Sequence, residues 1–185
     1  MFSRISLLGI VLLLISSVSH AYIVDGSRVN QPRLLSYAKD ALQNQGTIQQ
    51  NPNGFTYVRV PDSYITDLLQ KVARPGFGVP SYTQRNAVHG AHILIMTEEE
   101  TKNIKGLTEL GQTVQFKPLG FYTIVIHDKE YFMLAVDAPE ISELRKKYGL
   151  SEKLDNHAFH LTIGVRHLTA ENELASADEI ASSKN

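Results

Sequence analysis

The spacing of apolar residues changes along the chain between two periods. A period near 3.6 residues indicates helices, whereas strict alternation indicates strands. Helices and strands are interspersed, and several neighbouring strands are close enough to form hairpins. We therefore expect an α+β fold, with two-lobed antiparallel sheets backed by helices. The predicted helices cover residues 34–45, 61–73 and 139–148, with another beginning at Thr97, and the predicted strands cover 55–60, 88–96, 113–118, 121–127, 131–136 and 157–165.

The predicted strand at 157–165 has two different faces. Alternation places His160, Thr162 and Gly164 on one of them. An imidazole and a hydroxyl two residues apart therefore point the same way. The residues of the opposite face are apolar and suit a core; they are Phe159, Leu161, Ile163 and Val165.

The predicted strand at 88–96 repeats this pattern more weakly around His92. Both strands contain His-x-x-His followed by an apolar run, and each comes after a helix and a loop. We expect two similar halves, with His92 and His160 facing each other across a groove. His89 and His157 precede them by three residues, so they either face the opposite way or lie just before the regular strand.

The composition narrows the chemistry. The chain has 185 residues, enough to bury a sizeable core, and its formal net charge of −1 argues against a protein that coats duplex DNA through a broad basic surface. There is no cysteine, which excludes disulfides, thiolate nucleophiles and thiolate metal ligands. The two His-x-x-His pairs do not converge when they lie on strands, so we expect neither a metal nor another cofactor.

The first 21 residues have the pattern of a cleavable signal peptide. Arg4 is followed by a short apolar run from Leu7 to Ile15, and Ser19-His20-Ala21 has small residues at the two positions that define a cleavage site. The apolar run is shorter than the roughly 20 residues that span a bilayer. We expect export, to the periplasm or the medium, without a stable membrane anchor; the alternative is an uncleaved anchor.

These patterns divide the chain into four segments. They are a signal peptide at 1–21, a leader and helix at 22–54, a folded domain at 55–168 and a small, charged tail at 169–185. Within the domain, the predicted loop at 74–86 is long, and long loops in compact domains often carry function.

The histidine strands resemble a known family. His160-Leu161-Thr162-Ile163 resembles the His-x-Thr/Ser-apolar signature of the 2H phosphoesterases, two-lobed LigT-like proteins that carry two such motifs on facing strands. Gly90-Ala91-His92-Ile93 resembles the Swiss-army-knife, RNA-repair-like branch. The order of predicted elements from about Phe55 to Leu168 is similar too, so the resemblance covers most of the chain after the signal peptide.

This resemblance implies a metal-independent phosphoesterase that acts on 2′,3′-cyclic phosphates or related ends of nucleotides and RNA. His92 and His160 would be the acid and the base. Imidazole suits both roles because its unperturbed pKa is about 6.5, and the sequence does not reveal which histidine takes which role. Thr162 would bind a phosphate oxygen. We expect the protein to act as a monomer.

The first motif departs from the family pattern. It reads His92-Ile93-Leu94, so an apolar side chain replaces the Thr or Ser. A hydrogen bond to a charged group contributes about 1.5–3 kcal/mol, and its loss corresponds to a reaction slowed about ten- to a hundredfold. Either another donor replaces it, or the protein is a catalytically weakened phosphate- or nucleotide-binding module; a structural exported domain is a third alternative. The candidate replacement donors are Tyr82, Arg85, Lys117 and Tyr122.

Overall fold

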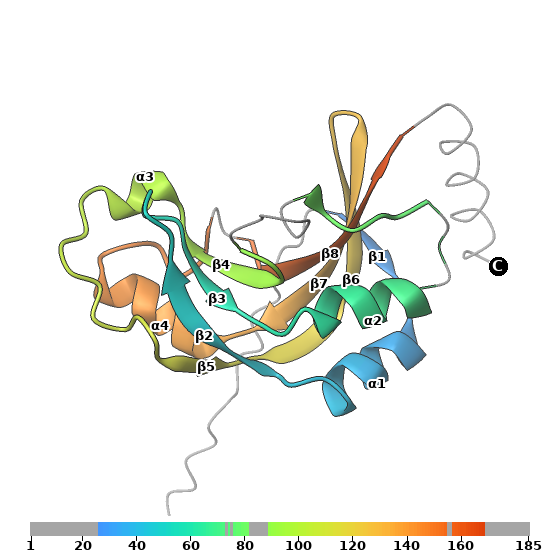
Figure 1. The fold of residues 1–185 in the computed structure, drawn as a ribbon, viewed down its shortest axis with the longest axis horizontal. Helices are drawn as coiled ribbons and strands as arrows, with labels where there is room; N and C mark the ends of the chain where they lie inside the picture. The colour runs from blue at the N-terminus through green and yellow to red at the C-terminus, as the bar shows by residue number, and fades with distance from the viewer. Residues whose placement is uncertain (1–25, 73, 75, 82–88, 155–156, 169–185) are drawn as a thin grey trace, which may run out of the picture.

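The computed structural model describes residues 26–72, 74, 76–81, 89–154 and 157–168. These residues form two four-stranded antiparallel sheets with helices packed on them, which confirms the predicted α+β class (Figure 1). The predicted signal peptide, the second half of the predicted loop at 74–86 and the predicted tail lie outside the described residues. No helix in the described part of the chain is both long and apolar enough to cross a membrane.

Each sheet has a histidine strand at one edge. The sheet with the order β1-β6-β7-β8 is called the β8 sheet here, and the sheet with the order β4-β3-β2-β5 is called the β4 sheet. The strands are β1 (Ser27–Val29), β2 (Gln45–Gln50), β3 (Thr56–Arg59), β4 (His92–Met96), β5 (Thr113–Gln115), β6 (Lys117–Ile126), β7 (Lys129–Asp137) and β8 (Phe159–His167).

The helices are divided between the two sheets. α1 (Pro32–Asp40) packs on β6 and α2 (Ser63–Lys71) packs on β8, so both cover the β8 sheet (Figure 1). α4 (Pro139–Lys147) packs on β4 and β5 of the other sheet. The short α3 (Glu98–Thr101) follows β4 and begins after Thr97, as predicted; the structure shows a capping box between Thr97 and Glu100. Buried apolar side chains from both sheets and the three longer helices form one core.

Two strands are absent from the sequence-based prediction. β1 lies in a segment predicted to be a loop, and β2 follows α1, which ends at Asp40 rather than at residue 45. The alternation in β2 is weak because Ile48 is its single large apolar residue. Gly46 allows β2 to pair closely with β3, since a Cβ there would lie 2.4 Å from the Arg59 carbonyl oxygen.

The predicted strands at 113–118 and 121–127 are divided differently in the structure. β5 ends at Gln115 and pairs with β2, whereas β6 begins at Lys117 and pairs with β7. The chain therefore passes from the β4 sheet to the β8 sheet at Phe116, whose side chain is buried. Periodicity does not reveal this crossing, because both sheets require the same alternation.

A bulge in β8 changes the face on which its last residues lie. The register with β7 shifts between Thr162 and Gly164, which leaves Ile163 as the extra residue. A Cβ on Gly164 would lie 2.7 Å from Leu69 of α2, so this position faces the core. The prediction that Gly164 shares the face of Thr162 is therefore wrong. Alternation beyond the bulge also turns the half-buried Val165 away from the core face that was predicted for it.

Arg145 of α4 is fully buried and joins distant parts of the fold. Its guanidinium donates to the Glu100 carboxylate at 2.7 and 3.1 Å, and to the carbonyl oxygens of Ile95 and Ser151. Ile95 belongs to β4, and Ser151 begins the segment that leads to β8. A buried charge requires such partners to offset its lost hydration. Arg145 therefore fixes the end of β4 relative to the segment that leads to β8.

We expect Arg145→Met to lower the free energy of unfolding by about 3–5 kcal/mol, because it leaves a carboxylate and two carbonyl oxygens without their donor. The matched control is Lys146→Met on the same helix. Lys146 is exposed and pairs with Glu143 at the surface, so its replacement should change stability by less than about 0.5 kcal/mol. Urea unfolding followed by circular dichroism measures both, and equal effects would contradict the role assigned to Arg145.

Candidate functional site

The strands that carry His92 and His160 lie next to each other. β4 is an edge of the β4 sheet, and β8 is an edge of the β8 sheet. The two edge strands are in contact, and Figure 1 shows them meeting near the middle of the molecule. Two histidines that are far apart in the sequence are thereby brought to one region of the structure.

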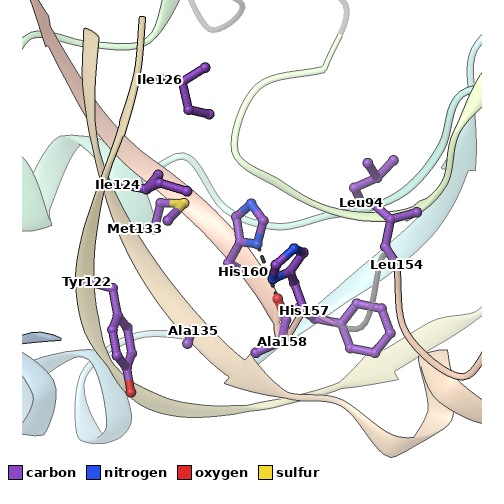
Figure 2. A pocket seen from close by; sticks show the side chains of 11 residues that line it. Leu94, Tyr122, Ile124, Ile126, Met133, Ala135, Leu154, His157, Ala158 and His160 are labelled. Atoms are coloured by element: carbon purple, nitrogen blue, oxygen red, sulfur yellow. Dashed lines mark hydrogen bonds between the residues drawn. The ribbon is translucent and has the colours of Figure 1, made fainter. Parts of the chain in front are cut away.

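The two imidazole rings are held in the same way. His92 Nδ1 lies 2.8 Å from the Gly90 carbonyl oxygen, and His160 Nδ1 lies 3.2 Å from the Ala158 carbonyl oxygen (Figure 2). Because a carbonyl oxygen only accepts, each Nδ1 donates its hydrogen to the backbone two residues earlier. In the neutral ring, Nε2 is then the nitrogen that can accept a proton. Both histidines therefore have the tautomer that suits proton transfer at Nε2.

The surroundings lower the pKa of both histidines below the usual value of 6.5. For His92, burial is the main cause, and the bond to the Gly90 carbonyl opposes it. Positive charge on His89, Arg59 or His160 lowers the pKa of the same ring further. For His160, loss of hydration beside neighbouring protein atoms is again the main cause, although the residue is exposed on one side. Positive charge on His160 is the smallest of the causes that lower the pKa of His92.

A cavity of about 250 Å³ opens beside His160 (Figure 2). Its wall comes from β6, β7 and β8, from the segment that precedes β8, and from Leu94 of β4. Both sheets therefore contribute to it. Apolar side chains form most of this lining, and its polar side chains are the imidazoles of His157 and His160 and the phenol of Tyr122.

A family model described as Swiss Army Knife, 2H phosphoesterase domain matches residues 56–169. The chain belongs to this family. The match spans both histidine strands and the elements between them, so the resemblance drawn from the sequence is confirmed. Searches among curated proteins and among solved structures returned no match.

Two further residues predicted for the site of this 2H phosphoesterase domain lie on the cavity side of the β8 sheet. Thr162 pairs with Met133, whose side chain lines the cavity, so alternation places the half-buried Thr162 on the same side as His160. Tyr122 lines the cavity from β6 (Figure 2). The hydroxyl-bearing second motif and one candidate donor therefore share one face of one sheet.

Of the remaining candidate donors, the structure places Lys117 away from this cavity and does not describe the other two. Lys117 is exposed at the first position of β6, where it pairs with Asp137, and it is not part of the cavity lining. Tyr82 and Arg85 lie outside the described residues. Tyr122 is thus the candidate donor for which the structure gives a position in the site.

Leu94 occupies the position where the family motif has a hydroxyl residue. Its side chain lines the cavity, two residues after His92 on the same side of β4. Tyr57 lies opposite Leu94 in the register of β3 and β4, but its hydroxyl donates to Gln49 at 3.1 Å. The first motif therefore presents a hydrocarbon surface to the cavity at the position where the family signature has Thr or Ser.

Arg59 lies beside the candidate site although no sequence pattern indicates it. Arg59 of β3 pairs with His92 of β4 in the sheet register. Alternation within β3 does not reveal which residue of a neighbouring strand Arg59 will lie beside.

The structure also decides between the two placements considered for His89 and His157. Both precede the regular strands: the His89 ring centroid lies 5.7 Å from that of His92, and His157 lowers the pKa of His160.

The histidines near β4 pack as aromatic rings. The rings of Phe55 and Tyr57 lie within 5.6 Å, centroid to centroid, of both His89 and His92. In the described part of the chain, no three His, Asp or Glu side chains come together in an arrangement that could hold a metal ion. The arrangement of these rings instead supplies the apolar surroundings that lower the pKa of His92.

The lowered pKa values predict that mild acid destabilises the fold. A histidine whose pKa is lowered by folding binds fewer protons in the folded state than in the unfolded chain. Its contribution is complete above the unfolded pKa of about 6.5 and is lost as the pH falls from there toward the folded pKa. We expect the free energy of unfolding in urea to fall between about pH 7.5 and pH 5, and to fall less in the double variant His92→Asn, His160→Asn. An identical fall in wild type and double variant would contradict this account.

Proposed function

We propose that the protein is a metal-independent 2H phosphoesterase that hydrolyses a 2′,3′-cyclic phosphate on a nucleotide or a related RNA end. Membership of the family supports phosphoester hydrolysis in general. The observation that carries the specific proposal is the matched pair of imidazoles. His92 and His160 each donate the Nδ1 hydrogen to the backbone and keep Nε2 for proton transfer. The contact between their strands, β4 and β8, supports a substrate shared between them.

Two histidines suffice for the two proton transfers of this hydrolysis. The neutral ring takes a proton from water as its oxygen attacks phosphorus, and the protonated ring gives a proton to the ribose oxygen that leaves. One P–O bond forms and one breaks, with the net addition of one water. Repulsion between two imidazolium rings favours the state in which one ring carries a proton and the other does not. Either histidine can take either role.

Side chains on the cavity side of the β8 sheet would hold the phosphate and the rest of the substrate. A hydrogen bond donated by the Thr162 or Tyr122 hydroxyl to a phosphate oxygen would stabilise the charge that develops in the transition state. The apolar lining suits the nucleoside part, because small-molecule sites combine apolar walls with few polar groups. The cavity of about 250 Å³ is small, so a cyclic mononucleotide is the appropriate first probe.

We expect His92→Ala and His160→Ala each to lower kcat for a 2′,3′-cyclic mononucleotide by about 10²–10⁴-fold, because each removes one proton-transfer group. His167→Ala is the matched control, since His167 is exposed at the far end of the same strand as His160 and pairs with Asp128. Its kcat should remain within about twofold of wild type. Product formation followed by chromatography measures all three variants.

The pH dependence of the same assay adds a second test. One ring must be neutral and the other protonated, so kcat/KM should be bell-shaped. Because both pKa values are lowered, its maximum should lie below about pH 6.5. EDTA should leave the rate unchanged. Activity that is lost with EDTA and returns with zinc would rule out the proposed mechanism.

A second candidate function is a phosphate- or nucleotide-binding module with weak turnover. The observation that favours it is Leu94, whose apolar side chain lines the cavity where the family motif has a hydroxyl. A site of this kind can keep the shape and the imidazoles that bind a ligand while it lacks one donor to the transition state. Binding of a 2′,3′-cyclic mononucleotide without product at high protein concentration would support this function over the first.

We expect Leu94→Thr to raise kcat by about ten- to a hundredfold, because it restores a donor worth about 1.5–3 kcal/mol to a charged phosphate. Leu94→Val is the matched control, since valine has the shape of threonine without its hydroxyl. The comparison of the two variants therefore isolates the hydrogen bond from the change in volume. Equal rates in the two variants would show that the missing hydroxyl does not limit turnover.

A further inference from the structure

Two charged residues hold the backbone just before His92. Asp62, at the start of α2, accepts a hydrogen bond from the Ala91 amide at 2.9 Å and another from Arg59 at 2.8 Å. Arg59, at the end of β3, donates to the Ala91 carbonyl oxygen at 3.0 Å and to the Val60 carbonyl oxygen. Ala91 is therefore bonded at both its N–H and its C=O by this one ion pair.

The Asp62 carboxylate serves this contact instead of its own helix. Asp62 is the N-cap of α2, where an aspartate side chain commonly accepts a bond from the first helical amides and contributes about 1 kcal/mol. It makes no such bond. Its Oδ1 bonds to Ala91 and its Oδ2 to Arg59. Although burial opposes the change, these bonds lower the pKa of Asp62, so the carboxylate remains charged.

Gly90 connects this ion pair to the imidazole. Its φ of +53° lies in the region that favours glycine, and a Cβ would lie 2.4 Å from Arg59 Nη2 and 2.8 Å from Asp62 Oδ1. Gly90 therefore packs directly against both charged side chains. Its carbonyl oxygen is the acceptor of the His92 Nδ1 hydrogen. A shift of the ion pair would thus be passed to the ring through one peptide group.

We propose that Asp62 and Arg59 are positioning residues for His92: they fix the Gly90 carbonyl so that the imidazole keeps its Nδ1–H tautomer and offers Nε2 to the substrate. The catalytic consequence rests on the proposed function, whereas the tautomer does not. His160 obtains the same tautomer from a different carbonyl, that of Ala158. The two histidines thus reach one arrangement by separate supports, and His160 is an internal reference for His92.

Nitrogen NMR of protein labelled at histidine tests the tautomer, because ring nitrogens with and without a hydrogen differ in chemical shift. In Asp62→Ala, we expect His92 to change from the Nδ1–H tautomer toward a mixture, while His160 is unchanged. Asp62→Asn keeps an oxygen for the Ala91 amide and should retain most of the wild-type signal. Glu99→Ala is the matched control, since it removes another carboxylate paired with a base three residues away and should change neither ring.

Kinetics with a 2′,3′-cyclic mononucleotide test the consequence for turnover. We expect kcat to fall about 10–100-fold in Asp62→Ala, with KM within about twofold, because a misplaced Nε2 slows proton transfer more than it weakens binding. Asp62→Asn should recover most of this loss. Circular dichroism establishes that each variant is folded; if Asp62→Ala is not, Arg59→Lys takes its place, with a smaller change of the same kind.

The two measurements fail separately. An unchanged His92 tautomer in folded Asp62→Ala and in Arg59→Lys would overturn the positioning role, whatever the kinetics. A changed tautomer supports it even if wild type shows no turnover, and in that case the proposed function fails and the positioning role stands. A fall in kcat with an unchanged tautomer would assign the ion pair a general structural role and overturn the inference.

Discussion

Two sheet edges that lie against each other determine where the site forms. An edge strand exposes backbone N–H and C=O groups and has to be covered. Near its end, β8 is covered by Gly78, which exchanges two hydrogen bonds with Val165 at 2.9 and 3.0 Å. β8 also lies against β4, the edge of the other sheet. Because α1 and α2 pack on the β8 sheet and α4 packs on the β4 sheet, the opposite faces are left to line the cavity.

The chemistry of the site follows from this contact. Each edge strand contributes one imidazole. Each imidazole is oriented by the carbonyl oxygen two residues before it, so both rings have the same tautomer. Their surroundings are apolar, which strengthens the effect of each charge on the other. A proton on one ring therefore disfavours a proton on its partner. The proposed division of the two rings into an acid and a base uses this coupling.

The sequence predicted that His160 and Thr162 share one face of β8, because alternation is reliable where a strand is regular. It holds from Phe159 to Thr162 and fails at Gly164, where the bulge adds a residue that periodicity does not register. β2 was not predictable in the same way, since a central strand with one large apolar residue resembles a polar loop.

The partners of His92 were also beyond the sequence. Asp62 bonds to Ala91 across 29 positions, and Arg59 bonds to the same residue across 32. A local pattern predicts the face on which a residue lies within its strand. It does not predict which distant side chains will bond to the backbone at the end of that strand. Tyr122 differs from Lys117 for a similar reason: both are on β6, and only the register of the folded sheet places Tyr122 at the cavity.

Leu94 shows how the apolar wall and the missing donor are connected. A buried methylene contributes about 0.8 kcal/mol, so a leucine that covers a nucleoside can gain nearly as much binding as the lost hydroxyl would have given to a phosphate. The two gains differ in when they act. Apolar contact is present equally in the bound substrate and in the transition state, so it lowers KM and leaves kcat unchanged, whereas a donor to developing phosphate charge raises kcat. Under the proposed function, leucine at this position favours retention of a ligand over rapid turnover, so the two candidate functions differ in the donor that this position lacks.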